Sequence, residues 1–168
     1  MSRGFVKEDD QEEIPMLPQR AYLPEGVTNF VTPSGMEQLL SEKKSMISEK
    51  EDLSHAGENE NERRIELNYI NAKLQLLNDR IASARVVDPG EQPKDEVRFG
   101  AKVTVKSEGG NIQTFHIVGV DEADISKGKI SFISPMSRIL VNKKIGNKVL
   151  LKRSGQDTVF EILAIEYT

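Results

Sequence analysis

Apolar residues recur at helical spacing between residues 34 and 86, and polar residues fill most of the other positions. In the second half of this stretch, apolar side chains stand three or four positions apart, which is the spacing of a heptad seam. The members of this seam are Leu67, Ile70, Leu74, Leu77, Ile81 and Ala84. A rougher seam in the first half consists of Met36, Leu39, Met46 and Leu53, with Lys43 and Lys50 in two seam positions and a second row at Leu40 and Ile47. The pattern predicts two amphipathic helices, each with one apolar stripe.

The two predicted helices are separated by a short, acidic, Asn-rich turn, so they are expected to fold back on each other as an antiparallel coiled-coil hairpin. Thr32 is placed to cap the first helix. Gly57 can end that helix, and Asn59 or Asn61 can cap the second one. The hairpin is therefore expected to cover residues 32–87.

A Pro- and Gly-containing linker at residues 88–95 separates the hairpin from a unit of different texture. There, short runs rich in β-branched and aromatic residues alternate with turn residues, which is typical of strands. The candidate strands are residues 97–99, 102–106, 113–120, 129–133, 148–152 and 159–167. A short helix is expected at residues 135–140. The predicted fold class is α+β, with the helical hairpin followed by a small antiparallel β-rich domain at residues 96–168.

Residues 1–31 carry a strongly acidic run and three prolines, so we expect an extended or disordered leader. Cysteine is absent from the sequence, which excludes a disulfide framework and a thiolate metal site and fits a reducing cytoplasm. No apolar run reaches about 18 residues, so neither a membrane span nor membrane association is expected. The two histidines, His55 and His116, lie far apart in sequence, which argues against zinc or serine-triad catalysis.

Several short motifs occur in an order that resembles one protein family. They occupy residues 31–35, 84–88, 99–105, 117–124, 131–136 and 165–167. Together they resemble the Gre family, the bacterial transcription elongation factors of the GreA/GreB type, from residue 31 to the C-terminus. The resemblance implies a coiled coil that enters the secondary channel of bacterial RNA polymerase, and an FKBP-like C-terminal domain that binds outside the channel.

The resemblance also implies roles for particular residues. Tip carboxylates would help hold the Mg²⁺ of the polymerase active site while the polymerase cleaves the 3′ RNA of backtracked complexes; the candidates are Glu58, Glu60 and Glu62. Basic residues on the coiled coil would contact the nascent RNA 3′ end; they are Lys43, Lys44, Lys50, Arg63 and Arg64. A polymerase-binding loop would contain Ser134, Pro135, Met136 and Ile139. The protein would then be a monomer that is not itself an enzyme and has no metal or cofactor of its own.

The residue types suit these roles, although each also fits a structural role. Magnesium prefers oxygen ligands and often takes only one or two carboxylates from a protein, yet acidic turns are commonly just solvated. The basic residues alternate with acids, as on a salt-bridged helix surface. Met136 and Ile139 can equally pack inward, and the acids of residues 121–124 are expected to cap backbone N–H groups in a turn.

Two departures from the family pattern keep alternatives open. The tip run is one residue shorter than in the family, and both helices are shorter by about one heptad, which removes roughly 10 Å of reach. The main alternative is a short-coil regulator that binds the polymerase channel without stimulating cleavage. An FKBP-like peptidyl-prolyl isomerase is disfavoured, because only 5% of residues are aromatic and an aromatic-lined proline pocket is then hard to build. A coiled-coil adaptor with no polymerase role is the last alternative.

Overall fold

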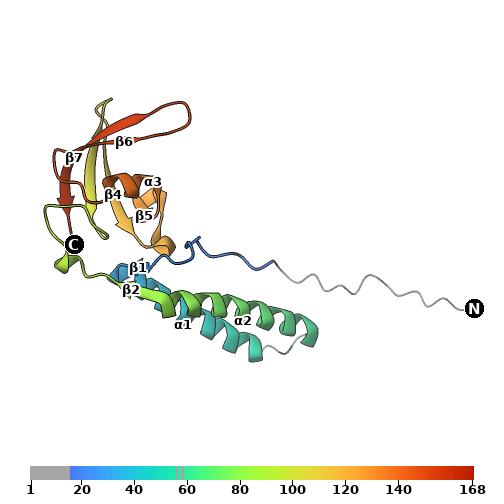
Figure 1. The fold of residues 1–168 in the computed structure, drawn as a ribbon. Coiled ribbons are helices and arrows are strands. Elements are labelled where there is room, and N and C mark those ends of the chain that lie inside the picture. Colours follow the sequence, from blue (N-terminus) through green and yellow to red (C-terminus); the bar gives the residue numbers. More distant parts are fainter. Residues whose placement is uncertain (1–15, 56, 58) are drawn as a thin grey trace, which may run out of the picture.

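The computed structural model describes residues 16–55, 57 and 59–168 of the chain. Two long helices form an antiparallel rod, and a five-stranded sheet with one short helix forms a second unit at one end of that rod (Figure 1). The helices are α1 (Pro33–His55), α2 (Glu60–Ser83) and α3 (Pro135–Leu140). The strands are β1 (Asn29–Val31), β2 (Ala84–Val86), β3 (Lys102–Ser107), β4 (Ile112–Val118), β5 (Lys129–Ser131), β6 (Lys148–Leu151) and β7 (Thr158–Glu166). The predicted α+β class is confirmed.

The rod closes around the predicted seam. Its two helices contain 23 and 24 residues, so each is roughly 35 Å long at about 1.5 Å per residue. The buried seam residues are Leu39, Met46, Ile70, Leu74 and Leu77, and Val31 of β1 joins the same cluster. Lys43 and Lys50 occupy seam positions and are half-buried, as expected for lysines whose stems follow apolar surface while their ammonium groups reach solvent.

The base of the rod is held by a parallel strand pair that the sequence pattern does not predict. Strand β1 lies beside β2, with Asn29 opposite Ala84 and Val31 opposite Val86. The side-chain amide of Asn29 donates to the backbone carbonyl of Arg80 at 3.0 Å. The segments before α1 and after α2 are therefore joined. The second helix ends at Ser83 because the chain becomes extended at Ala84.

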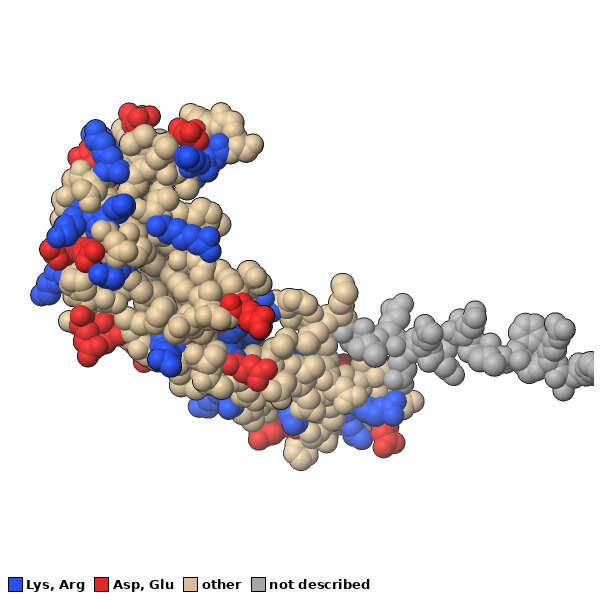
Figure 2. All heavy atoms as spheres, viewed as in Figure 1, with Lys and Arg blue, Asp and Glu red and all other residues tan. Residues whose placement is uncertain are grey.

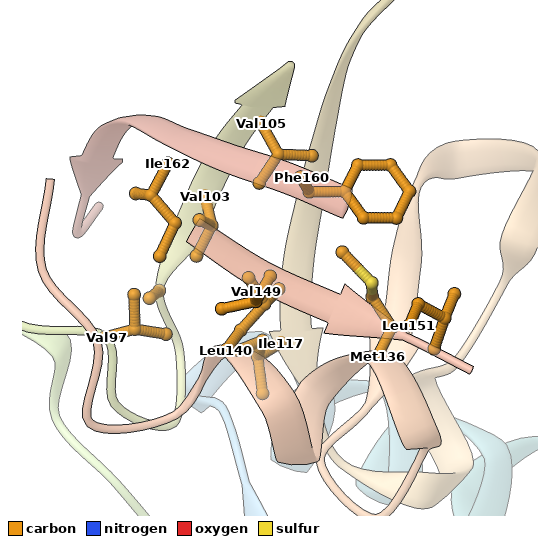
Figure 3. Close-up of a cluster of buried hydrophobic side chains, with 11 residues drawn as sticks. Val97, Val103, Val105, Ile117, Met136, Leu140, Val149, Leu151, Phe160 and Ile162 are labelled. Carbon is orange, nitrogen blue, oxygen red and sulfur yellow. The ribbon is translucent and has the colours of Figure 1, made fainter. Parts of the chain in front are cut away.

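The sheet of the second unit has the strand order β5-β4-β3-β7-β6. All neighbouring strands are antiparallel except β4 and β5, which are parallel, so the expected all-antiparallel sheet is wrong at this edge. Helix α3 packs on one face and places Met136 and Leu140 against Leu151 and Val149 in the core (Figure 3). The core alternates along β3, where Val103 is buried and its neighbours are not, as expected for a sheet with one covered face.

The strand expected at residues 97–99 does not form. Val97 is fully buried, and its N–H donates to the carbonyl of Lys143 at 2.9 Å. Glu96 makes only an isolated bridge with Lys144. The apolar signal of this run thus reports burial rather than a strand. Over the residues that the structure covers, no helix is both long enough and apolar enough to cross a membrane.

Candidate functional site

The free end of the rod presents two carboxylates. Asn59 caps α2 through its side chain, which accepts a hydrogen bond from the N–H of Asn61 at 3.1 Å. Glu60 and Glu62 lie in the first helical turn and are exposed, and the positive end of the helix dipole favours acids there. Neither carboxylate has a hydrogen bond or ion pair with another described residue. Glu58, the third candidate, lies outside the described residues.

These tip carboxylates do not form a metal site by themselves. Among the described residues, no group of three or more histidine, aspartate and glutamate side chains could hold a metal ion. One or two exposed carboxylates supply only part of a magnesium coordination shell, and the remaining ligands have to come from water or another molecule. The tip can therefore donate ligands to an ion held elsewhere.

The candidate RNA-contacting residues lie along both helices of the rod. Lys43, Lys44 and Lys50 belong to α1, and Arg63 and Arg64 lie just after the start of α2. Figure 2 shows basic and acidic side chains interleaved along the visible face of the rod. The three lysines nevertheless make no ion pair with another described residue, so the salt-bridged interpretation does not apply to them. Their ammonium groups are available to a phosphate.

The segment that resembles the polymerase-binding loop forms the start of α3. Ser134 is the N-cap and accepts a hydrogen bond from the N–H of Ser137 at 3.2 Å. Met136 is buried in the core, and Ile139 packs partly against it. Pro135 is exposed. The inward-packing alternative therefore describes Met136 and Ile139, and an apolar contact with a partner has to come from Pro135 and from neighbouring segments.

A joint connects the rod to the second unit, and sequence reasoning did not find it. The carboxylate of Glu122 accepts hydrogen bonds from the N–H of Thr32 at 3.1 Å, from the Thr32 hydroxyl, and from the N–H of Gly119 at 3.0 Å. Thr32 also accepts from the N–H of Gly35 at 3.0 Å, which confirms its role as the cap of α1. The predicted turn with capping acids is confirmed at Asp124, which accepts from the N–H of Ser126.

Beside this joint lies an aromatic-lined cavity of about 560 Å³. Phe30, Phe99 and Phe132 contact one another, with ring centroids 5.7 to 5.8 Å apart. Arg98 and Arg138 line the same cavity, and Arg138 has no ion pair with another described residue. The low aromatic content suggested that such a cavity is hard to build, yet half of the six phenylalanines converge here from β1 and from the segments flanking β3 and β5.

Comparisons with known proteins identify the family. Residues 92–167 match the family described as transcription elongation factor, GreA/GreB, C-term. The chain is also 32% identical over 151 residues to transcription elongation factor GreA of Rhodospirillum rubrum, across 82% of this chain and 96% of that protein. The chain belongs to the GreA/GreB family of transcription elongation factors. The likeness of its motifs to the Gre family is thereby confirmed.

Two further matches cover less of the relative or have lower identity. Transcription elongation factor GreA of Thermodesulfovibrio yellowstonii is 37% identical over 100 residues, which cover 59% of this chain and 63% of that protein. The chain thus matches less than two thirds of the length of the first Gre relatives. Among solved structures, GreA factor homolog 1 of Thermus thermophilus has 19% identity and a TM-score of 0.40, over 83% of this chain and 99% of that one.

Proposed function

We propose that this Gre-family chain binds bacterial RNA polymerase and promotes cleavage of the 3′ RNA in backtracked, arrested complexes. The observation that supports the proposal best is the pair of exposed carboxylates of Glu60 and Glu62, which have no ion-pair partner among the described residues, at the free end of a rod roughly 35 Å long. The opposite end of that rod is fixed to a β-rich unit by Thr32 and Glu122. A domain that binds outside the channel can therefore carry carboxylates to a site deep within a partner.

The proposed reaction requires only a few oxygen ligands from the factor itself. Hydrolysis of a phosphodiester at a two-metal site needs a second ion and an oriented water, and both are stabilised by hard oxygen ligands. Glu60 and Glu62, together with Glu58, would supply such oxygens to the Mg²⁺ of the polymerase active site. The factor would then act as a monomer in the cytoplasm, and the hydrolytic activity would remain that of the polymerase.

The lysines of α1 would hold the displaced RNA. Lys43, Lys44 and Lys50 have ammonium groups without an ion-pair partner among the described residues. Arg63 and Arg64 lie near the free end of the rod. Basic side chains of this kind attract the phosphates of RNA of any sequence, and the attraction weakens with salt. That property suits a factor that meets different transcripts in the same channel.

The second unit would supply the binding surface outside the channel. Pro135 is exposed at the start of α3, and Arg138 follows one helical turn later beside the aromatic cavity. A partner with an apolar side chain for the cavity and a carboxylate for Arg138 fits this surface. Ser134 would position Pro135 by capping α3, while Met136 and Ile139 would support it from inside.

The alternative of a channel-binding regulator without cleavage rests on the length of the rod. Helix α1 has 23 residues, and the sequence suggests a loss of roughly 10 Å of reach relative to the family pattern. Metal ligation tolerates errors of only a few tenths of an ångström. A rod that stops short would bind the channel and leave the catalytic metal untouched.

Purified backtracked elongation complexes test both versions. We expect the unmodified protein to release short 3′ RNA fragments in a Mg²⁺-dependent reaction. A variant with Glu58→Gln, Glu60→Gln and Glu62→Gln is expected to lose this release while binding the polymerase as before. Glu51→Gln, an exposed acid near the end of α1, is the matched control and should keep full activity. Binding without fragment release would favour the regulator, and failure to bind polymerase would overturn both versions.

A further inference from the structure

The segment before β1 lies across the rod and the second unit together. We define residues 17–23 as the strap. Its residues line two shallow hollows, one with Leu76 and Arg80 of α2, and one with Glu42 of α1 and Asp121 of the second unit. Figure 1 shows this segment running beside the helices before it enters β1. The strap therefore contacts both the rod and the second unit.

Arg20 is the residue through which the strap reaches both bodies. Its two terminal nitrogens lie 2.8 and 3.0 Å from the two carboxylate oxygens of Glu42, which is a two-pronged hydrogen-bonded pair. Its Nε donates to Oδ1 of Asp121 at 3.2 Å. The guanidinium thus joins α1 to η3, the short 3-10 helix (Val120–Glu122) that follows β4.

The same aspartate forms a longer ion pair, without a hydrogen bond, with the other helix. Nη1 of Arg80, on α2, lies 3.7 Å from Oδ2 of Asp121. Arg80 also donates a hydrogen bond to the carbonyl of Ala21, within the strap. Asp121 therefore lies between two arginines, one from the strap and one from the rod, and the strap backbone closes the ring of contacts.

Three of these four charges are largely shielded from solvent, unlike those of ordinary surface ion pairs, whereas the side chain of Glu42 is 38% exposed. The side chains of Arg20, Arg80 and Asp121 are only 17%, 14% and 7% exposed. Surface ion pairs contribute little because water screens them, whereas removing one partner of a buried group leaves a charge without compensation. The hydrogen bond to Glu42 raises the pKa of Arg20 above its ordinary value, and the charge of Asp121 acts in the same direction against burial.

We propose that the strap braces the rod against the second unit, with Arg20 as the positioning residue that fixes their relative orientation. Three segments far apart in sequence, namely the strap, α1 and η3, meet at its guanidinium. Arginine is required because only a planar fork can bind Glu42 with two nitrogens and still donate to Asp121 with a third. This inference concerns the free protein and does not depend on the proposed function.

A distance measurement between the two bodies tests the brace. Because the sequence has no cysteine, Ser54→Cys near the end of α1 and Gln156→Cys in the turn between β6 and β7 create a unique pair of spin-label sites on the full chain. We expect one narrow distance distribution. Arg20→Ala is expected to lose it and to give a broad or second population. Arg153→Ala, at an exposed residue outside these contacts, is the matched control and should leave the distribution narrow.

Two further variants separate the loss of the planar guanidinium from the loss of its charge. Arg20→Lys keeps the charge and loses the fork, so it should broaden the distribution almost as much as Arg20→Ala. Glu42→Gln should broaden it less, because Asp121 still holds the strap. Circular dichroism of each variant checks that the helices and the sheet remain folded. A distribution that stays narrow in folded Arg20→Ala and Arg20→Lys would overturn the proposal.

Discussion

Thr32 and Glu122 stand 90 positions apart in the sequence, and Thr32 donates both its backbone N–H and its hydroxyl to the Glu122 carboxylate. Both residues are buried, with 7% and 8% of their surface exposed. The same threonine oxygen accepts from the N–H of Gly35 and so begins α1. The start of the first helix and its attachment to the second unit are therefore one arrangement of hydrogen bonds.

Removing the Thr32 hydroxyl tests this arrangement. Thr32→Val keeps the shape of the side chain, but α1 loses its cap and the buried carboxylate of Glu122 loses a donor. We expect the free energy of unfolding to fall by about 2–3 kcal/mol, measured by urea denaturation. Ser34→Ala, at an exposed neighbour in the same turn, should change it by less than about 0.5 kcal/mol. Equal effects of the two substitutions would contradict the assigned role.

Gly35 provides a test in which the sign of the effect is informative. An alanine normally stabilises a helix by up to about 1 kcal/mol relative to glycine. At this position, however, an added Cβ would lie 2.1 Å from the Glu122 carboxyl carbon, so the carboxylate would have to move and break its bonds to Thr32. Gly35→Ala is therefore expected to lower the melting temperature. A rise in the melting temperature would show that the carboxylate can move at no cost.

The apolar seam predicts a contrast between two leucines of the rod. Leu77 is fully buried, whereas Leu40 is 49% exposed. Leu77→Ala should cost about 2–5 kcal/mol in free energy of unfolding, because it removes apolar contacts and leaves a cavity between the helices. Leu40→Ala should cost well under half of that. The helical signal in circular dichroism during urea titration distinguishes the two, and comparable losses would argue against the helix pairing described above.

His116 predicts a pH dependence of stability. Burial lowers its pKa from the ordinary value of 6.5, and the neighbouring charges of Lys102 and Lys129 lower it further, while Glu122 opposes them. The folded protein therefore binds a proton less readily than the unfolded chain. The contribution of His116 to stability is present above pH 6.5 and is lost as the pH falls towards the lower folded value.

Urea midpoints measured from neutral pH down past 6.5 check this expectation. The midpoint of the unmodified protein should fall as His116 becomes protonated, and His116→Asn should remove part of that slope. Lys106→Gln, an exposed site on the same strand β3 as Lys102, serves as a control for general charge effects. Parallel midpoint curves for the unmodified protein and the histidine variant would contradict the shift.

The sequence predicts the rod because its signal is long and periodic. The spacing from Leu67 to Ala84 repeats over several turns, and a buried face of that length can be satisfied only by a partner helix. Strand β3 is predicted for a similar reason, since Val103 and Val105 alternate with polar neighbours. These elements can be predicted because their apolar pattern repeats over several residues.

The joint escapes sequence reasoning because its pieces are short and distant. Strand β1 has only three residues and pairs with a strand that begins at Ala84, beyond the whole hairpin. Glu122 lies in an acidic run that is predicted to cap backbone N–H groups in a turn, and nothing local distinguishes it from Asp124, which caps only its own turn. Glu122 is buried and Asp124 is not, because Thr32 packs against Glu122 in the folded chain.

The candidate site is predicted in part. The position of the tip follows from the turn residues around Gly57 and Asn59, and Asn59 does cap the second helix. The inward position of Met136 and the convergence of Phe30 with Phe132 follow from packing between segments that lie far apart in the chain. Residue types alone carry no information on such contacts.

The length of the rod sets a demand on its attachment. If the hairpin pivots as a lever about the contact between Thr32 and Glu122, each degree of rotation displaces its far end by roughly 0.6 Å, since the arm is roughly 35 Å long. Metal–oxygen bonds accept errors of about 0.2 Å. The positions of the Glu60 and Glu62 carboxylates therefore depend on the orientation of the rod at its attached end, far from the carboxylates themselves.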